Sequence, residues 1–373
     1  MNICIVCGAR PNIIKVAPLI RAIRAAGSPS LRGEAGGELA GDISYQLVYT
    51  GSAADPDVEG GIYSDLQIPR PDACLGVTCR NLNELTGEVM QRFDAYLRLH
   101  AVDTVVVVDD LASAMAVAIV TKKHGIRLAH IAAGTRSFDI NMPKEVNRLV
   151  IDGLSDILFT AGASNTSIAN REGAELSKVY MVGNILIDNL RFVHSRLREP
   201  PLAAALGLRR GGYLVFTLNR KALIADRQNM QRMVSAIVSH SGSVPVVAPL
   251  HTAAAAVVGA SLPPSAKERF RIVDPLPYMQ FTWLTANTKG IVTDSGNVAE
   301  EATFNHVPCI TLNSYTEHIE TVRQGTNVLV GEDAAKLGAA VADIVAGNWK
   351  AGTLPDRWDG RTAERILSIL SQG

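Results

Sequence analysis

The stretch Gly290-Ile-Val-Thr-Asp-Ser-Gly-Asn-Val-Ala-Glu-Glu-Ala302 combines a short apolar run, a Ser-Gly turn and a helix-forming segment. This order predicts a buried β-strand over 290–293 that runs directly into a helix. Ser295 can cap that helix, which leaves the first N–H groups, those of Gly296 and Asn297, available at its positive end. Such a helix end is an anion site, most often for phosphate.

Glu301 lies on the same face of this predicted helix as Asn297, four residues earlier. Its carboxylate can accept hydrogen bonds from a diol such as ribose. A phosphate site beside a diol site indicates a nucleotide. A capped helix with a solvated acidic face gives the same pattern, so the segment alone leaves both interpretations open.

Similar apolar runs recur along the chain, with helical stretches between them. Continuous apolar strands that alternate with helices predict parallel sheets covered on both faces. The predicted strands are 3–7, 45–49, 104–108, 128–131, 157–159, 179–182, 213–217, 244–248, 270–273, 290–293, 309–312 and 327–330. These are too many for one sheet, so we expect two doubly wound, Rossmann-like α/β domains with a cleft between them.

The chain length of 373 residues also favours two domains. The strand spacing relaxes near residues 183–206, where a helix and Pro200-Pro201 indicate a connection. We expect a first domain over residues 1–185, joined by a C-terminal helix over 359–373. Residues 186–358 are expected to form the second domain.

Composition excludes several classes of protein. The chain has 36 basic and 36 acidic residues, without a basic stripe, so neither a nucleic-acid nor a membrane-surface partner is indicated. It begins with a strand-like run rather than a signal sequence, and no apolar run approaches the roughly 18 residues that span a bilayer. We expect a soluble, cytoplasmic protein. The five cysteines and eight histidines form no convincing metal-binding pattern, so no metal is expected.

In parallel α/β sheets, ligands bind beyond the carboxyl ends of the strands. Arg10 and Lys15 follow the first strand, where two cations beside a helix N-terminus can neutralise a diphosphate. An exposed basic turn would give the same pattern. Asp109 and Asp110 directly follow four valines. Carboxylates at the end of so buried a strand need a task or a partner, which favours a functional role.

Three further positions follow strands or begin helices. His130 fits a satisfied core histidine, an interpretation that we prefer to a functional one. Glu145 and Arg148 are spaced to form a simple salt bridge on one helix face. His251 follows a predicted strand at the side where ligands bind, so we expect it to contact a sugar or a phosphate.

Several of these pieces occur together in a fixed order. They are Gly8-Ala-Arg-Pro with Lys15, His130-Ile-Ala-Ala-Gly-Thr-Arg136, Pro143-Lys-Glu-Val-Asn-Arg148, Gly183-Asn-Ile-Leu-Ile-Asp188, Asp274-Pro-Leu-Pro-Tyr278 and Thr293-Asp-Ser-Gly-Asn-Val-Ala-Glu-Glu301. Over nearly its whole length, the chain resembles the non-hydrolysing UDP-N-acetylglucosamine 2-epimerases. A set of motifs in order is far more specific than any one of them.

The resemblance implies a glycosyltransferase-B-like fold, with UDP held mainly by the second domain and catalysis in the cleft. It implies that Ser295, Gly296 and Asn297 hold phosphate, and that Glu301 holds the ribose. The other substrate-binding residues that it implies are Phe281 beside the uracil, Arg10 and Lys15 facing the diphosphate and sugar, and Arg136. The substrate implied is a UDP-sugar, and members of the family are commonly homodimers.

The implied mechanism needs neither a metal nor a redox cofactor. A base removes the C2 proton, and UDP leaves from C1 in an anti elimination that gives a 2-acetamidoglucal. UDP adds again after protonation on the other face. The weakly acidic C2 proton demands a well-placed carboxylate and stabilisation of the departing diphosphate.

The chain departs from the family pattern at positions that carry chemistry. Ala132 and Lys144 stand where the family has glutamates, Asn219 stands for a histidine, and Asp109 precedes the family's Asp110. We therefore expect an acid/base set rebuilt around Asp109, Asp110 and Glu145. Two alternatives stay open: a glycosyltransferase-like enzyme that acts on another UDP-sugar, and a catalytically silent protein that binds a nucleotide-sugar.

Overall fold

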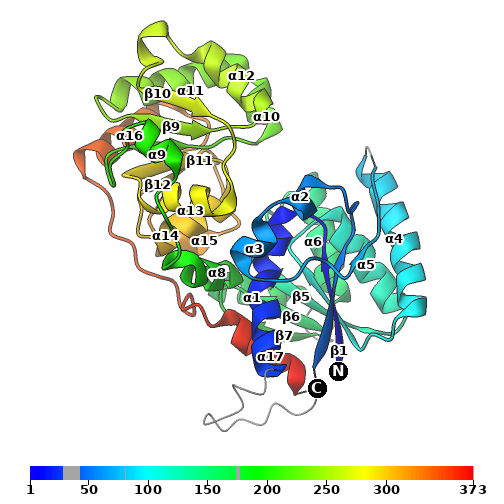
Figure 1. Ribbon diagram of the computed structural model, residues 1–373. Coiled ribbons are helices and arrows are strands. Elements are labelled where there is room, and N and C mark those ends of the chain that lie inside the picture. The colour runs from blue at the N-terminus through cyan, green and yellow to red at the C-terminus, as the bar shows by residue number, and fades with distance from the viewer. Residues whose placement is uncertain (28–42, 80, 174–176, 373) are drawn as a thin grey trace. The chain divides into compact units, whose positions relative to one another are not determined.

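The computed structural model describes residues 1–27, 43–79, 81–173 and 177–372, which form two compact units (Figure 1). Unit 1 comprises Met1–Val193 and Asp356–Gly373, and unit 2 comprises His194–Pro355. Each unit is built on a parallel β-sheet with helices between successive strands. The predicted fold class of two doubly wound α/β domains is confirmed.

Unit 1 contains a seven-stranded sheet in the order β3-β2-β1-β4-β5-β6-β7, with every pair parallel. Its strands are β1 (Asn2–Cys7), β2 (Ser44–Tyr49), β3 (Ala73–Cys74), β4 (Thr104–Val108), β5 (Arg127–Ala133), β6 (Ile157–Thr160) and β7 (Lys178–Met181). The strand order reverses between β1 and β4, which makes this the place where a doubly wound sheet binds its ligand.

The helices of unit 1 cover the sheet. They are α1 (Arg10–Gly27), α2 (Pro56–Glu59), α3 (Ile62–Leu66), α4 (Leu82–Leu99), α5 (Ala112–Lys123), α6 (Pro143–Leu154), α7 (Ala163–Gly173), α8 (Ile185–His194) and α17 (Thr362–Ser371). Helices α4, α5 and α6 pack side by side, whereas α1 packs beside α17 (Figure 1). The apolar face of α4 and most of α5 are buried against β1 and β4.

Unit 2 contains a six-stranded parallel sheet in the order β10-β9-β8-β11-β12-β13. Its strands are β8 (Leu214–Phe216), β9 (Val246–Pro249), β10 (Phe270–Val273), β11 (Gly290–Thr293), β12 (Cys309–Thr311) and β13 (Asn327–Leu329). Its helices are α9 (Pro201–Ala205), α10 (Lys221–Ala225), α11 (Arg227–His240), α12 (Thr252–Ser261), a 3-10 turn (Pro264–Ala266), α13 (Tyr278–Ala286), α14 (Gly296–Phe304), α15 (Ile319–Arg323) and α16 (Ala334–Ala346).

Alternate residues of the unit 2 strands enter two separate cores. Leu214 and Phe216 of β8 pack with α11, α12 and α16, whereas Val215 packs with α13 and α14. Successive side chains of a strand point to opposite faces, so both faces of this sheet are apolar and covered. This explains why the strands read as continuous apolar runs.

Helix α8 belongs to unit 1, although the predicted boundary falls at residue 185, where the helix begins. The carboxylate of Asp188 accepts hydrogen bonds from the N–H groups of Thr362 (3.2 Å) and Ala363 (2.8 Å). These donors open α17, so Asp188 satisfies the positive end of that helix and ties it to α8. The chain therefore leaves unit 1 after Val193 and returns to it at Asp356.

Each of the twelve predicted strands occurs at its predicted place. Within the described ranges, the strand that the sequence did not predict is β3, which has only two residues and therefore no periodicity to detect. No helix among the described residues is both long and apolar enough to cross a membrane.

Candidate active site at the strand ends

The end of β4 carries a strained acidic residue. Asp109 has φ +59°, in the left-handed region that non-glycine residues seldom adopt, at a cost of about 1–3 kcal/mol. Its carboxylate forms an ion pair with the buried Lys15 (2.6 Å) and accepts a hydrogen bond from the Nδ2 of Asn12 (3.2 Å). A charge-assisted hydrogen bond contributes about 1.5–3 kcal/mol, so contacts of this kind are strong enough to hold the conformation.

The neighbouring carboxylate of Asp110 is held by cations of α6. Its Oδ2 accepts hydrogen bonds from Nη2 (2.6 Å) and Nε (2.9 Å) of Arg148, and its Oδ1 lies 3.3 Å from the ammonium of Lys144. Burial acts to raise the pKa of Asp110, but Lys144 and Arg148 outweigh it and hold that pKa below its ordinary value. Asp110 is therefore ionised at neutral pH.

Glu145 is buried on the first turn of α6 and holds the loop before it. One carboxylate oxygen accepts the N–H (2.8 Å) and the hydroxyl (2.9 Å) of Ser137, and the other accepts the N–H of Phe138 (3.0 Å). Arg148 pairs with the first oxygen at 3.1 Å. Burial raises the pKa of Glu145, but these four donors together hold it below its ordinary value. Arg148 thus links Glu145 to Asp110.

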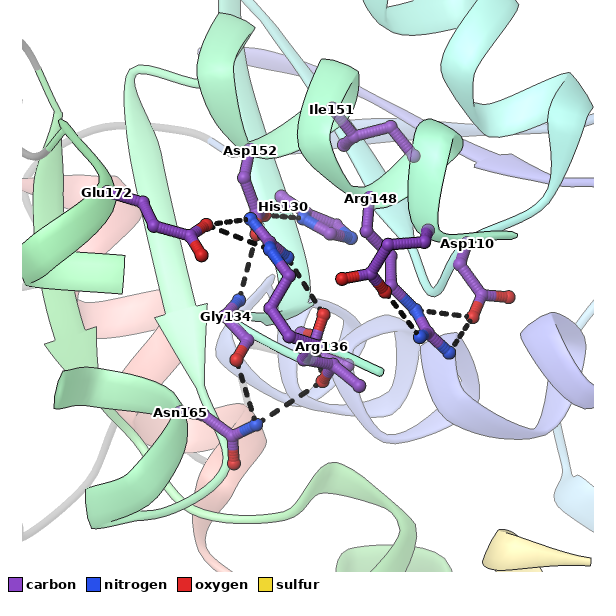
Figure 2. A network of polar contacts seen from close by, with 12 residues as sticks. Asp110, His130, Gly134, Arg136, Arg148, Ile151, Asp152, Asn165 and Glu172 are labelled. Atoms are coloured by element: carbon purple, nitrogen blue, oxygen red, sulfur yellow. Dashed lines mark hydrogen bonds and ion pairs between the residues drawn. The ribbon is translucent and has the colours of Figure 1, made fainter. Parts of the chain in front are cut away.

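A second buried network lies beside Arg148 and its partner Asp110 (Figure 2). The carboxylate of Asp152 accepts hydrogen bonds from Nδ1 of His130 (2.6 Å) and from the N–H of Gly134 (3.0 Å). Arg136 bridges Asp152 (2.8 Å) and Glu172 (2.7 Å). The sequence predicted that Arg136 binds substrate. In this structure its guanidinium side chain is only 2% exposed and is engaged by both carboxylates, so it holds the network together.

Ala132, which stands where the family pattern has a glutamate, occupies a bulge at the end of β5. The register between β5 and β6 shifts there, and Ala132 has φ +69°. A bulge near the end of a strand re-aims the chain beside a site. The N–H of Asp109 donates to the carbonyl of Ile131 (3.2 Å), which brings the acidic end of β4 next to this bulge.

In unit 2, the strand–turn–helix segment folds as the sequence predicts. Ser295 caps α14, and its hydroxyl accepts a hydrogen bond from the N–H of Val298 (3.5 Å). Asp294 accepts the N–H groups of Asn219 (2.8 Å) and Arg220 (2.5 Å), which fixes the loop after β8 beside the start of α14. The free N–H groups of a helix's first turn make this edge suited to an anion.

Two glutamates follow on α14. Glu300 pairs with Nδ1 of His318 (2.7 Å), and the ring of His318 lies so close to Gly296 that a Cβ there would overlap it, at 2.4 Å. Glu301 is buried, and its Oε2 has no hydrogen-bond partner among the described residues. Burial raises the pKa of Glu301 to about 8, and the charge of Glu300 acts in the same direction. A buried carboxyl without a partner is costly, which is typical of a group that awaits a ligand.

Three further predicted residues lie in the segments that follow β1 in unit 1 and β9 and β10 in unit 2. Arg10 is half-buried at the start of α1, His251 is exposed before α12, and Phe281 is half-buried on α13 beside the core of unit 2. Within unit 1, Lys15 is paired with Asp109, and Arg148 links Asp110 to Glu145. The structure gathers Ser295, Gly296, Asn297 and Glu301 on α14 within unit 2.

Sequence reasoning missed Asn12 and Asp152. The Oδ1 of Asn12 accepts the N–H of Gly8 (3.1 Å) while its Nδ2 reaches Asp109. Asp152 shares one face of α6 with Glu145 and Arg148, at intervals of three and four residues. That spacing of charged residues on one helix face was a signal available in the sequence.

Comparison with known proteins gives a consistent result. A sequence model described as UDP-N-acetylglucosamine 2-epimerase matches residues 38–371. The UDP-N-acetylglucosamine 2-epimerase of Methanocaldococcus jannaschii is 30% identical over the whole of both chains, and its crystal structure in complex with UDP-GlcNAc and UDP superposes with a TM-score of 0.84.

A second relative and a more distant structure extend the comparison. The UDP-2,3-diacetamido-2,3-dideoxy-D-glucuronate 2-epimerase of Pseudomonas aeruginosa is 31% identical over 89% of this chain and 88% of its own. A sucrose-phosphate synthase from Thermosynechococcus elongatus, 15% identical over 100% of this chain and 97% of its own, shares the fold alone, with a TM-score of 0.61.

The raised pKa of Glu301 predicts how stability depends on pH. The folded protein binds this proton more tightly than the unfolded chain, in which the carboxyl of Glu301 has its ordinary pKa of 4.5. The stabilising contribution is therefore complete below about pH 4.5 and is lost as pH rises through about 8. We expect Glu301→Gln, which removes the titration, to gain in unfolding free energy relative to the parent as pH rises across this window.

Equilibrium unfolding in urea at both ends of the window measures the effect, with the exposed Glu268→Gln as the control. A difference between Glu301→Gln and the parent that is the same at both pH values would contradict the assignment.

Proposed function

The chain belongs to the UDP-N-acetylglucosamine 2-epimerase family, and we propose that it interconverts UDP-GlcNAc and UDP-ManNAc by elimination and re-addition of UDP. The observation that carries the proposal is the pair of carboxylates at the end of β4, Asp109 and Asp110, with Lys15 and Arg148 bound to them. A family match over residues 38–371 supports the same reaction.

The proposed chemistry uses this pair for proton transfer. One carboxylate takes the proton from C2, and the electron pair of the C2–H bond forms C1=C2. At the same time the C1–O bond breaks, and its electron pair leaves on the β-phosphate oxygen of UDP. A proton then returns to C2 on the opposite face, and UDP adds again at C1. Removal and return on two faces call for two acid/base groups, and we assign them to Asp109 and Asp110. Glu145 remains in the proposed catalytic set through Arg148, which it shares with Asp110.

Unit 2 is the proposed holder of UDP. Ser295, Gly296 and Asn297 would bind the phosphates at the start of α14, because the dipole and first-turn N–H groups of a helix favour an anion. Glu301 would accept the ribose hydroxyls, which supplies the partner that its buried Oε2 lacks. Arg10, Lys15 and His251 are proposed for the diphosphate and sugar, with Phe281 beside the uracil. A homodimer, a cytoplasmic location and a role in cell-envelope polysaccharide synthesis stay part of this proposal.

Exchange of the C2 proton in deuterated water tests the reaction. We expect the protein to introduce deuterium at C2 of UDP-GlcNAc, followed by NMR. Asp110→Asn should slow this exchange by about 10²–10⁴-fold, since it removes an acid/base group, and should leave the affinity for UDP unchanged. Asp103→Asn is the matched control because this exposed residue directly precedes the same strand at its opposite end.

Two outcomes would contradict the proposal. Binding of UDP without exchange and without a new sugar from UDP-GlcNAc would exclude the epimerisation of UDP-GlcNAc. Failure to bind UDP would overturn the nucleotide site as well.

Lys144 favours a second candidate, the same epimerisation on an acidic UDP-sugar. Its ammonium lies 3.3 Å from Asp110, yet its side chain is 60% exposed, so a cation stands open beside the proposed acid/base pair. A sugar carboxylate is the group that such a cation attracts. The Pseudomonas aeruginosa relative is named for a UDP-glucuronate derivative of this kind.

Comparing the two substrates separates the candidates. If the substrate is acidic, kcat/KM for the UDP-diacetamido-glucuronate should exceed that for UDP-GlcNAc. Lys144→Met, which keeps length and removes charge, should then reduce this preference by about tenfold, the equivalent of one ionic contact of about 1.4 kcal/mol. The exposed Lys123→Met serves as control. A parent that prefers UDP-GlcNAc, with no change in Lys144→Met, would exclude the acidic sugar.

A further inference from the structure

His130 places each of its ring nitrogens against a hydrogen-bond acceptor. Nδ1 lies 2.6 Å from a carboxylate oxygen of Asp152, and Nε2 lies 2.9 Å from the backbone carbonyl oxygen of Asp109. The residue is 2% exposed, so water does not reach it to supply other partners. The sequence interpretation of a satisfied core histidine agrees with this burial and with both partners, but it does not say what the contact with the Asp109 carbonyl does.

Asp152 is an acceptor on both oxygens. Its other oxygen receives the N–H of Gly134 (3.0 Å) and the guanidinium of Arg136 (2.8 Å). Burial raises the pKa of Asp152, but the charges and hydrogen bonds of His130 and Arg136 hold it below its ordinary value. The guanidinium of Arg136 and the N–H of Gly134 both favour the ionised carboxylate, to which Nδ1 then donates.

A backbone carbonyl oxygen accepts and never donates, so Nε2 must donate as well. A histidine that donates from both nitrogens is an imidazolium. The charges agree with this assignment, because His130 and Arg136 then face Asp152 and Glu172 as two cations against two anions.

The carbonyl that His130 holds belongs to the peptide unit between Asp109 and Asp110. That peptide follows a residue at φ +59°, where the backbone needs outside contacts to stay in place. Before this peptide, the N–H of Asp109 donates to the carbonyl of Ile131. After it, the carbonyl of Asp110 accepts a hydrogen bond from Nδ2 of Asn147 (2.8 Å). The direction of both carboxylates therefore depends on how the central carbonyl is held.

We propose that His130 is a positioning residue for the epimerisation, an imidazolium held by Asp152 that fixes the Asp109–Asp110 peptide and so aims both carboxylates. This inference rests on the proposed function. His130 acts through the backbone of the acid pair rather than on the substrate.

Two amide variants separate the two ends of the ring. The amide nitrogen of a glutamine lies near the position of Nε2, so His130→Gln keeps a donor toward the Asp109 carbonyl. The amide of an asparagine lies near Nδ1, so His130→Asn keeps the contact with Asp152 and loses the peptide. We expect kcat to fall by about 10²-fold in His130→Asn, the effect of a small misplacement of catalytic groups, and to recover to within about tenfold in His130→Gln.

The affinity for UDP should stay unchanged in both variants, since Ser295, Gly296, Asn297 and Glu301, which are proposed to hold UDP, lie in unit 2. If His130 mattered only for the stability of the core, both substitutions would lower kcat to the same extent. Equal kcat in His130→Gln and His130→Asn would therefore overturn the proposal.

NMR of protein labelled with ¹⁵N-histidine gives an independent readout that does not depend on activity. The parent should show protons on both ring nitrogens of His130. Asp152→Asn should convert the ring to a neutral form with its proton on Nε2, and should retain kcat within about tenfold because that proton still reaches the Asp109 carbonyl. A neutral ring in the parent would contradict the imidazolium. If the parent protein did not bind UDP, the proposed function would be contradicted instead.

Discussion

The peptide between Asp109 and Asp110 is the constraint on which the candidate site depends. It follows a strand of buried valines, β4, and includes a residue in the left-handed region. This turn places two carboxylates beyond the carboxyl end of the strand. Without outside contacts, strain of about 1–3 kcal/mol would allow this turn to relax. Lys15 and Arg148 hold the side chains, and His130 holds the carbonyl. The surrounding motifs therefore act together on one short piece of backbone.

The acid groups of this site have a different distribution from the family pattern. Ala132 lies in a bulge with φ +69° at the end of β5 and carries no acid, whereas Asp109 places one at the end of the adjacent β4. The N–H of Asp109 donates to the carbonyl of Ile131, so the two positions are neighbours across the sheet. A carboxylate lost from one strand end is thus matched by a carboxylate gained at the next. This exchange of positions is the physical basis for our proposal that the chain carries out the reaction with an altered set of residues.

The sequence predicted the fold because its strands are buried on both faces. A run such as Thr104–Val108 is recognisable without any knowledge of its neighbours, and the cap at Ser295 follows from local chemistry. The sequence also predicted that Asp109 and Asp110 need partners, and that Glu145 and Arg148 lie on one helix face. It did not predict β3, which is too short to show a pattern, or the roles of residues that depend on tertiary contacts.

Arg136 and His130 illustrate that second limit. An arginine in a motif fits a phosphate contact or a buried ion pair equally well, and the ion pairs of Arg136 with Asp152 and Glu172 are visible only in the structure. In the same way, a core histidine becomes a positioning residue only when both of its partners are known. The boundary near α8 depends on Asp188 meeting the N-terminus of α17, a contact between segments far apart in the chain.

The most direct test of the account moves the carboxylate back. Asp109→Gly removes the acid and tolerates the left-handed turn, and the addition of Ala132→Glu returns an acid to the adjacent strand end. The rate of deuterium exchange at C2 of the UDP-sugar is the measurement. We predict that Asp109→Gly alone slows exchange by at least about 10²-fold and that the double variant regains most of the loss. Exchange at the parental rate in Asp109→Gly would contradict the central claim that this strand end carries the acid/base chemistry.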